Sequence, residues 1–341
     1  MNTDPNYYLP SFYTIYMNSS KSLDEFFGSN EEHCLFHEYI HYLEDILTTY
    51  GVTSSSQKMN NIKALYHHAK DLEKSDAILT SGEDLDEISD LNKKLFKLYL
   101  QYKPDIEHIP FEESIYKIGQ VPESVEFPDG SKKSINTYLL YLKCGKKIKF
   151  GGQALMESVS HILEKNIYKI ESEDYIIPYD LAYMIWIHYL PNEKDNLIAL
   201  LDLEEFSLQF YNPSEIFIST LEKITAGEIE LTPNFYKQLM VIWHTNDGKS
   251  ALELYEFGIK QLKEDIEGVF VADVYAVFKE CLLQILDKAL EFNKKGEPLF
   301  SVILAAYDKD NISDFFDKFG ACFGMPTVIN ADGGLADFWV K

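Results

Sequence analysis

The pentad His37-Glu38-Tyr39-Ile40-His41 combines residue types that bind a metal ion and move a proton. On a helix, positions i and i+4 lie on one face, so the imidazoles of His37 and His41 project side by side. Two imidazoles held in this way can bind one Zn²⁺ at about 2.0–2.1 Å per bond. Glu38 points in a neighbouring direction, from which its carboxylate can reach a water on the metal and act as a general base.

A zinc site needs a third protein ligand. The short pattern H-E-x-x-H-x-x-G-x-x-H fails, because Glu44 replaces the Gly and Leu47 the third His. No Glu stands about twenty residues downstream either, where the chain has Asn60 and Asn61. The third ligand must therefore come from a distant segment.

Glu157 and His161 form a second i, i+4 pair, in residues 151–165, which the pattern predicts as a helix after a short strand at 146–150. Together with the first pentad, this segment resembles the gluzincin type of zincin-like metallopeptidases, in which an E-x-x-x-D helix supplies the third ligand. The resemblance rests on residues 29–51 and 146–165, and it implies Glu157 as a zinc ligand beside His37 and His41. His161 stands where the family has Asp, so it can be a further ligand or an oxyanion donor. The other interpretation is that Glu157 and His161 are the solvated side of a helix.

The resemblance also implies a mechanism. Zinc would polarise a substrate carbonyl and lower the pKa of its water towards about 7. Glu38 would pass a proton from that water to the leaving amine. The candidates for the donor to the oxyanion are His161, Tyr183 and His188, each of which can equally be a core or surface residue. We expect Asp45 to hold an imidazole N–H, unless it is a solvated helix carboxylate.

The composition excludes several classes of protein. A net charge of −24, with every basic residue a Lys, argues against nucleic-acid binding. No long apolar run and no signal-peptide pattern occur, which indicates no membrane association and a cytoplasmic location. Scattered cysteines indicate reduced thiols. They are Cys34, Cys144, Cys281 and Cys322.

The element that carries the first pentad is predicted as a helix over residues 30–50. Residues 29–32 read as a capping box, and Gly51 suits the left-handed position after a helix end. One face of this helix is broadly apolar, and the polar stripe with His37 and His41 is expected to face outward.

The rest of the chain is predicted as follows. Residues 52–145 are an insertion with a mobile loop at 52–60, helices at 61–75 and 84–102, and a hairpin of 124–127 and 132–142. Residues 178–341 are a helical C-terminal domain that ends in a loop-like stretch at 319–334. The fold class is therefore α+β and predominantly α-helical, with a zincin-like unit and a small sheet in residues 1–177.

These patterns favour a zinc-dependent peptidase that acts on a peptide or protein substrate, with a regulatory protein partner to restrain it. The alternative is a non-catalytic helical interaction protein whose H-E-x-x-H is accidental or decayed. A metallohydrolase acting on a non-peptide amide is a third possibility. Only the metal content and the effect of Glu38→Gln separate the first two.

Overall fold

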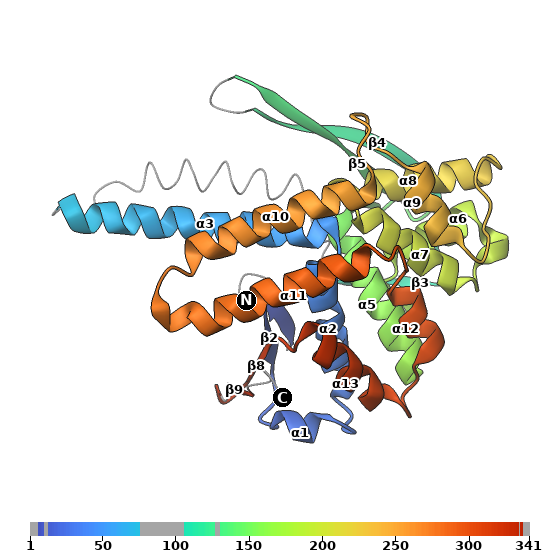
Figure 1. Cartoon of the computed structure of the whole chain (residues 1–341). Coiled ribbons are helices and arrows are strands. Elements are labelled where there is room, and N and C mark those ends of the chain that lie inside the picture. The colour runs from blue at the N-terminus through green and yellow to red at the C-terminus, as the bar shows by residue number, and fades with distance from the viewer. Residues whose placement is uncertain (1–5, 10–12, 76–105, 127–129, 334, 337–341) are drawn as a thin grey trace.

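The computed structural model describes residues 6–9, 13–75, 106–126, 130–333 and 335–336 (Figure 1). The fold is α+β and predominantly helical, as the sequence predicts. Its helices are α1 (Leu23–Phe26), α2 (Glu32–Leu47), α3 (Thr49–Ser75), α5 (Gly152–Tyr168), α6 (Leu181–Tyr189), η2 (Pro191–Glu193), α7 (Leu197–Leu208), α8 (Pro213–Thr225), α9 (Phe235–Ile242), α10 (Ala251–Val269), η3 (Asp273–Tyr275), α11 (Ala276–Asn293), α12 (Phe300–Ala306) and α13 (Ile312–Phe323). The strands form three small sheets.

The first sheet joins the two ends of the described chain. Its order is β1 (Tyr7–Leu9), β2 (Thr14–Met17), β8 (Thr327–Asn330), β9 (Leu335–Ala336), and β2 pairs in parallel with β8. A parallel pair needs a crossover connection, and here that connection is nearly the whole protein. Strands and helices from both sides of the expected boundary at residue 178 therefore pack together, including α3 against α10.

The other sheets lie beside α5 and α6. The strands β4 (Ile115–Glu126) and β5 (Lys132–Leu142) form a long antiparallel hairpin, and β6 (Lys147–Phe150) pairs with β5. In Figure 1 this hairpin projects from the helical body. The expected hairpin and the short strand before α5 are thus confirmed, while β4 begins earlier than predicted. A two-stranded sheet of β3 (Glu107–Pro110) and β7 (Asp174–Ile177) completes the set.

The junction after α2 differs from the prediction. The expected loop at 52–60 is wrong, because α3 begins at Thr49. Thr48 is extended and caps both helices: its hydroxyl donates to the Glu44 carbonyl at 2.8 Å and accepts from the Gly51 N–H at 3.0 Å. Gly51 is a close-approach position, since an added Cβ would lie 2.3 Å from the Glu44 carbonyl oxygen. This glycine therefore permits a tight turn between two helices, and it does not mark the end of a helix.

The start of α2 also differs from the prediction. The helix begins at Glu32 with Glu31 at its N-cap position, and no side chain caps it there. Ser29 instead accepts from the backbone N–H of Glu31 at 3.1 Å, and the Glu32 carboxylate accepts from the Gly28 N–H at 3.1 Å. The two side chains of the expected capping box thus accept hydrogen bonds from backbone N–H groups in the turn before the helix. They do not cap the N–H groups of the first helical residues.

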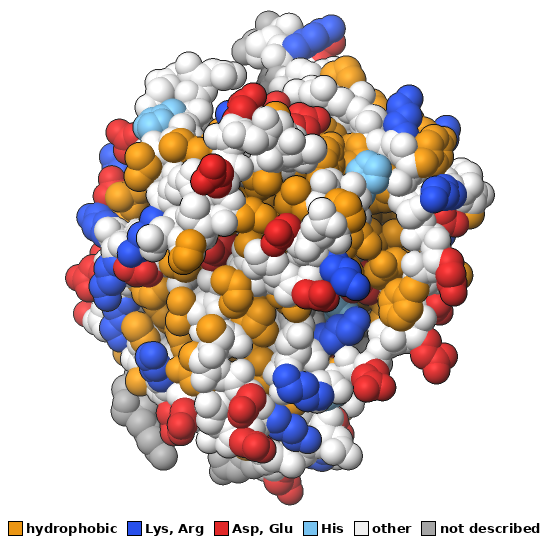
Figure 2. Space-filling model, turned by 90° about the vertical axis from the view of Figure 1, so that its right-hand side faces the viewer, with side chains coloured by type: hydrophobic (Ala, Val, Ile, Leu, Met, Phe, Trp, Pro, Cys, Tyr) orange, Lys and Arg blue, Asp and Glu red, His pale blue; other side chains and the backbone are white. Residues whose placement is uncertain are grey.

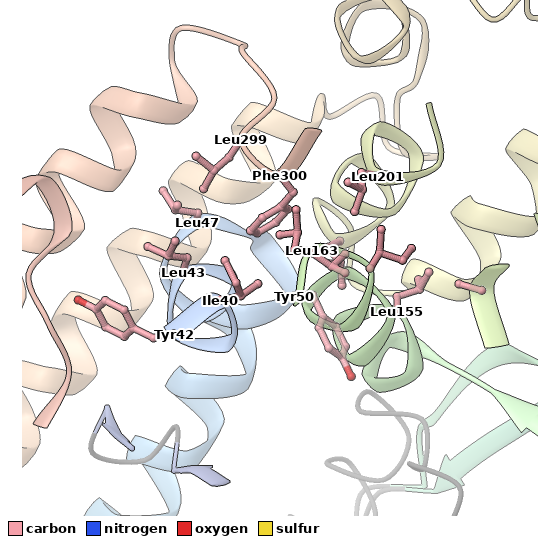
Figure 3. Packing of buried hydrophobic residues seen from close by; sticks show 14 of the residues in the cluster. Ile40, Tyr42, Leu43, Leu47, Tyr50, Leu155, Leu163, Leu201, Leu299 and Phe300 are labelled. Atoms are coloured by element: carbon pink, nitrogen blue, oxygen red, sulfur yellow. The ribbon is translucent and has the colours of Figure 1, made fainter. Parts of the chain in front are cut away.

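The apolar face of α2 packs into the core on several sides. Ile40, Leu43 and Leu47 are buried and lie near Leu299 and Phe300 in Figure 3. The remaining part of this face is covered by aromatic rings of α13, including Phe315, whose ring centroid is 5.1 Å from that of Phe36. Burial of such side chains contributes about 1.5–3 kcal/mol each, so the helix is fixed firmly in place.

The polar face of α2 is buried too, which corrects the expectation that it faces outward. His37 and Glu38 are 8% and 9% exposed, and Glu44 and Asp45 are 0% and 1% exposed. The reason is that α5 packs against one side of this face, while α3 and β1 lie beside Asp45. A buried polar face requires partners inside the protein, and the two histidines find carboxylates on α5 and on α2 itself.

The C-terminal stretch at 319–334 is not loop-like, contrary to the prediction. Its first part is the end of α13, and residues 327–330 form β8. The prediction of a loop rested on the glycines of this stretch. Gly324, with φ +77°, is instead the residue at which α13 ends and the chain turns toward the sheet. The expected helix at 84–102 lies outside the described residues.

The surface mixes charges of both signs. Figure 2 shows the side on which α6 lies, where acidic, lysine and hydrophobic side chains are interspersed. Among the helices that the structure describes, none is long and apolar enough to cross a membrane.

Candidate metal centre

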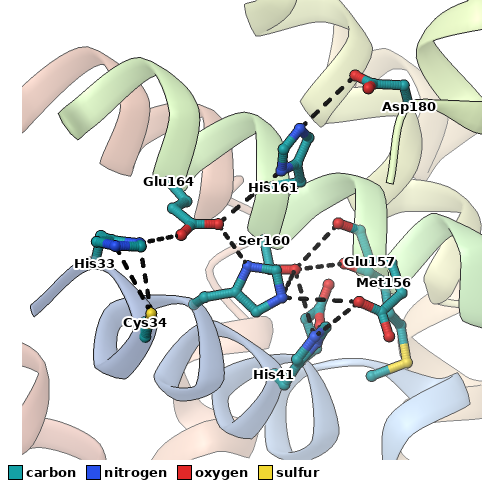
Figure 4. Close-up of polar contacts among 11 residues, drawn as sticks. His33, Cys34, His41, Met156, Glu157, Ser160, His161, Glu164 and Asp180 are labelled. Atoms are coloured by element: carbon teal, nitrogen blue, oxygen red, sulfur yellow. Dashed lines mark hydrogen bonds and ion pairs between the residues drawn. The ribbon is translucent and has the colours of Figure 1, made fainter. Parts of the chain in front are cut away.

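Three side chains from the two facing helices lie close together, and Figure 4 labels two of them, His41 and Glu157. One ligand atom from each of His37, His41 and Glu157 lies within 4.8 Å of the others. Glu157 Oε2 is 3.7 Å from His37 Nε2 and 3.5 Å from His41 Nε2. The structure thus brings together the residues that the sequence singles out as metal ligands.

The helical spacing places these groups as the sequence predicts. His37 and His41 stand one turn apart on α2, with ring centroids 4.9 Å apart, and Glu157 faces them from α5. Ser160 stands beside Glu157 on α5, and its Oγ lies 3.2 Å from His37 Nε2 and 3.4 Å from His41 Nε2. The serine hydroxyl also donates to the backbone carbonyls of Met156 and Glu157.

Each imidazole is oriented by a carboxylate at its other nitrogen. His37 Nδ1 is 2.9 Å from Glu164 Oε2, and His41 Nδ1 is 2.7 Å from Glu44 Oε2. A carboxylate at Nδ1 directs Nε2 toward the opposite side, which is the usual arrangement around metal-binding histidines. Glu164 also contacts His33 Nδ1 at 2.5 Å, so this carboxylate joins two histidines of α2.

Without a metal, the carboxylates hold both imidazoles as cations. Burial alone would lower their pKa values, but the neighbouring carboxylates raise the pKa of His37 well above its usual range and that of His41 to about 10. Burial would raise the pKa of Glu164, yet its hydrogen bonds from His33 and His37 lower it to about 2. A metal ion must displace these protons, because imidazole ligands bind as neutral groups.

No family model, no curated protein and no solved structure matches this chain. The chemistry of the site must therefore be argued from its own geometry.

The donor set could hold a metal ion, and zinc is one ion whose preferences can be compared with it. Tetrahedral ligands at about 2.0–2.1 Å from a centre lie roughly 3.3 Å from one another. The two distances between imidazole nitrogen and carboxylate oxygen, 3.5 and 3.7 Å, are close to that separation. Two nitrogens and one oxygen are also a ligand set of catalytic zinc sites, which keep a fourth position open.

Glu38 follows His37 directly and is buried on the same helix. Its charge contributes to the raised pKa of the His37 imidazole, which places its carboxylate in the electrostatic environment of the group. The arrangement keeps it as the candidate proton acceptor.

The other candidates lie outside the group of three ligands. His161 is on α5, with Nε2 3.8 Å from Asp180 Oδ1 and Nδ1 4.0 Å from Glu164 Oε2. Tyr183 and His188 lie on α6 and line a pocket together with His161. The contact expected of Asp45 is made by Glu44, whereas Asp45 is buried near Lys58, Tyr8 and Ser55.

Sequence reasoning missed three contributors. Glu164 lies seven positions after Glu157, a spacing of two turns that keeps both on the face toward α2, so a longer window would have found it. Glu44 lies three positions after His41, on the same stripe. Tyr179 follows no ligand spacing, and only the fold places its ring 5.9 Å from that of His37 and 5.3 Å from that of His161.

Proposed function

We propose that the protein is a zinc-dependent peptidase. The observation that carries the proposal is the convergence of His37, His41 and Glu157, with Glu157 Oε2 at 3.7 and 3.5 Å from the two Nε2 atoms. An accidental H-E-x-x-H pattern gives no reason to expect a third ligand from a distant segment. Here a carboxylate from a helix more than a hundred residues away completes the set.

The residues would have the following roles. Bound zinc would supply the Lewis acidity that polarises a carbonyl and acidifies water. His37, His41 and Glu157 would hold it, with Glu164 and Glu44 fixing the two imidazoles. The carboxylate of Glu38 would accept a proton from the attacking water and deliver it to the leaving amine.

We assign stabilisation of the oxyanion to a side chain that lies beside His37. His161 remains a candidate donor, and Tyr179 joins it, because its ring contacts the rings of both His37 and His161. One such donor contributes about 3 kcal/mol to transition-state stabilisation in enzymes of this kind. Tyr179→Phe and His161→Gln, assayed separately, would identify which side chain has this role.

A zincin-like arrangement is part of the same proposal. Its support is the pair of facing helices, α2 and α5, with the strand β6 leading directly into α5 at Gly151. Peptides in extended conformation would be the substrates, acted on in the cytoplasm under the control of a protein partner. These last assignments rest on the sequence alone.

The deciding experiment measures zinc and hydrolysis in the same preparations. Protein purified without chelators or a histidine tag is assayed for metal content by mass spectrometry and for cleavage of a peptide library. The variants are Glu38→Gln, which is close to isosteric, and Glu157→Ala. We expect about one zinc per chain in the wild type, retained in Glu38→Gln without cleavage and lost in Glu157→Ala.

A second candidate is a non-catalytic helical protein, and one observation favours it. The Ser160 hydroxyl lies 3.2 and 3.4 Å from the two Nε2 atoms, so the chain itself contacts the nitrogens that would face a metal. This alternative predicts no zinc after reconstitution and a Glu38→Gln variant that matches the wild type in every assay. Zinc without cleavage of any peptide would instead indicate a hydrolase for a non-peptide amide.

A further inference from the structure

A large pocket lies next to the metal centre. Its volume is about 870 Å³, and it is formed by α5, α6, η2, β7 and the segment 111–115. Pockets of roughly 300–1,000 Å³ are the usual size of small-molecule sites. The apolar part of its wall includes Ile115, Ile162, Tyr175, Met184, Ile187 and Leu197.

The charged residues at the rim of this pocket offset one another. Lys169 and Lys194 are exposed there, and so are Glu171 and Asp195. Side chains of both signs on a solvated rim contribute little to selection by charge. Figure 2, which views the side that carries α6, shows the same mixture of signs over the surface.

The carboxylates in the wall are already bonded to the chain. Glu113 accepts the backbone N–H groups of Ser114 and Cys144 at 3.0 and 3.1 Å. Asp180 accepts the backbone N–H of Ile176 at 2.7 Å. Because backbone donors stabilise these carboxylates, neither needs a cationic ligand.

The cation in the wall has no such partner. Lys165 is partly buried on α5, one turn after His161, and no described carboxylate lies within 4.0 Å of its ammonium. Beside it, Nε2 of His161 is buried and forms no hydrogen bond among the described residues, and Asp180 Oδ1 lies 3.8 Å from it. An ammonium group gains from an anionic partner, whereas the apolar part of the wall favours hydrocarbon or aromatic groups.

We infer that this pocket binds an apolar organic ligand with one anionic group, which pairs with the ammonium of Lys165. The inference rests on the pocket and its charges and is independent of the proposed peptidase activity. A free organic acid and the C-terminal carboxylate of an apolar peptide share this chemistry. In either case the ligand would lie against the wall formed by His161, close to the metal centre.

The test is a binding titration of the full-length protein with 8-anilinonaphthalene-1-sulfonate, an aromatic anion whose fluorescence rises in apolar sites. Lys165→Met removes the charge and keeps an apolar stem, and Ile187→Trp fills the pocket from a half-buried position. We expect each to weaken binding by at least about tenfold, the loss typical of one charge-assisted contact or of a blocked site. Lys165→Arg, which keeps the charge, and Lys260→Met, an exposed residue outside the pocket, should bind as the wild type does.

Competition then identifies the source of the anion. Decanoate and N-acetyl-leucyl-phenylalanine are compared with their neutral amides as displacing ligands. Displacement by decanoate supports a free acid, and displacement by the peptide acid supports a peptide C-terminus. Equal displacement by the amides would overturn the inference, and so would unchanged dye affinity in both Lys165→Met and Ile187→Trp.

Discussion

Glu164 Oε2 lies 2.9 Å from Nδ1 of His37, across two helices and 127 positions of sequence. The contact fixes the orientation of an imidazole whose other nitrogen faces Glu157. The carboxylate that the sequence led us to expect beside an imidazole N–H was that of Asp45. Glu164 also binds His33, so one buried anion organises the N-terminal half of the α2 polar face.

Removal of this charge should weaken metal binding without removing a ligand. In Glu164→Gln we expect zinc affinity to fall about 10–100-fold, as it does when the carboxylate behind a metal-binding histidine is lost. The measurement is competition against a chromogenic chelator at pH 7.5. Glu171→Gln, an exposed position on the same side of the protein, serves as the control. An unchanged affinity in Glu164→Gln would show that His37 does not bind the metal.

The turn between α2 and α3 should tolerate no side chain at Gly51. A Cβ there would lie 2.3 Å from the Glu44 carbonyl oxygen and 2.4 Å from the Asp45 Cα, both rigid backbone atoms. Gly51→Ala should therefore lower the free energy of unfolding by about 1–3 kcal/mol or more. The measurement is urea denaturation. Gly268→Ala is the matched control, because a Cβ there meets only the flexible end of Lys63, and it should be neutral or slightly stabilising.

Stability should fall as the pH rises from 6 to 8. Burial raises the pKa of Glu205 to about 8, although backbone N–H groups of Phe300 and Leu299 partly oppose the shift. The folded state thus keeps a proton that the unfolded state has lost above about pH 4.5, and this preference disappears as the pH passes 8. The loss amounts to roughly 2 kcal/mol between pH 6 and 8, at about 1.4 kcal/mol per pH unit.

The variant that isolates this effect is Glu205→Gln, which can still accept the backbone N–H groups but does not titrate. Denaturation curves at pH 6, 7 and 8 should show a smaller loss of stability in this variant than in the wild type. Glu264→Gln, at an exposed position, should leave the pH dependence unaltered. Parallel curves for Glu205→Gln and the wild type would contradict the assignment.

The hydroxyl of Tyr42 anchors the C-terminal part of the chain to the metal-site helix. It donates to the Phe323 carbonyl at 2.6 Å in a fully buried position. Tyr42→Phe leaves that carbonyl without its donor and should lower the free energy of unfolding by about 1–3 kcal/mol. Calorimetry or urea denaturation measures this, with the exposed Tyr116→Phe as control. An effect no larger than that of the control would show that another donor satisfies the carbonyl.

Local patterns predicted most elements that surround the site. The i, i+4 pairs on α2 and α5 identified which side chains can point to a common centre, because helical geometry alone sets that relation. The hairpin of β4 and β5 was equally visible from its strand-forming residues. Each of these predictions depends on neighbours within one or two turns of the chain.

What the sequence could not reveal depends on contacts between distant segments. Gly51 was read as a helix stop, but its role comes from the backbone of α2 that packs against it. The burial of Glu44 beside α5, and of Asp45 beside α3 and β1, follows from the packing of distant segments on α2, which no local pattern encodes. Tyr179 reaches the metal centre only through the fold of the segment between α5 and α6.

The parallel pairing of β2 with β8 has a consequence for biosynthesis. During translation, β2 and α2 emerge from the ribosome early, but β8 and the rings of α13 that cover Phe36 emerge only after residue 312. Contacts between segments so distant in sequence are among the last to form. A nascent chain therefore carries α2, with His37 and His41, before the rings of α13 cover its apolar face, and this helix reaches its final packing only after residue 312 has been made.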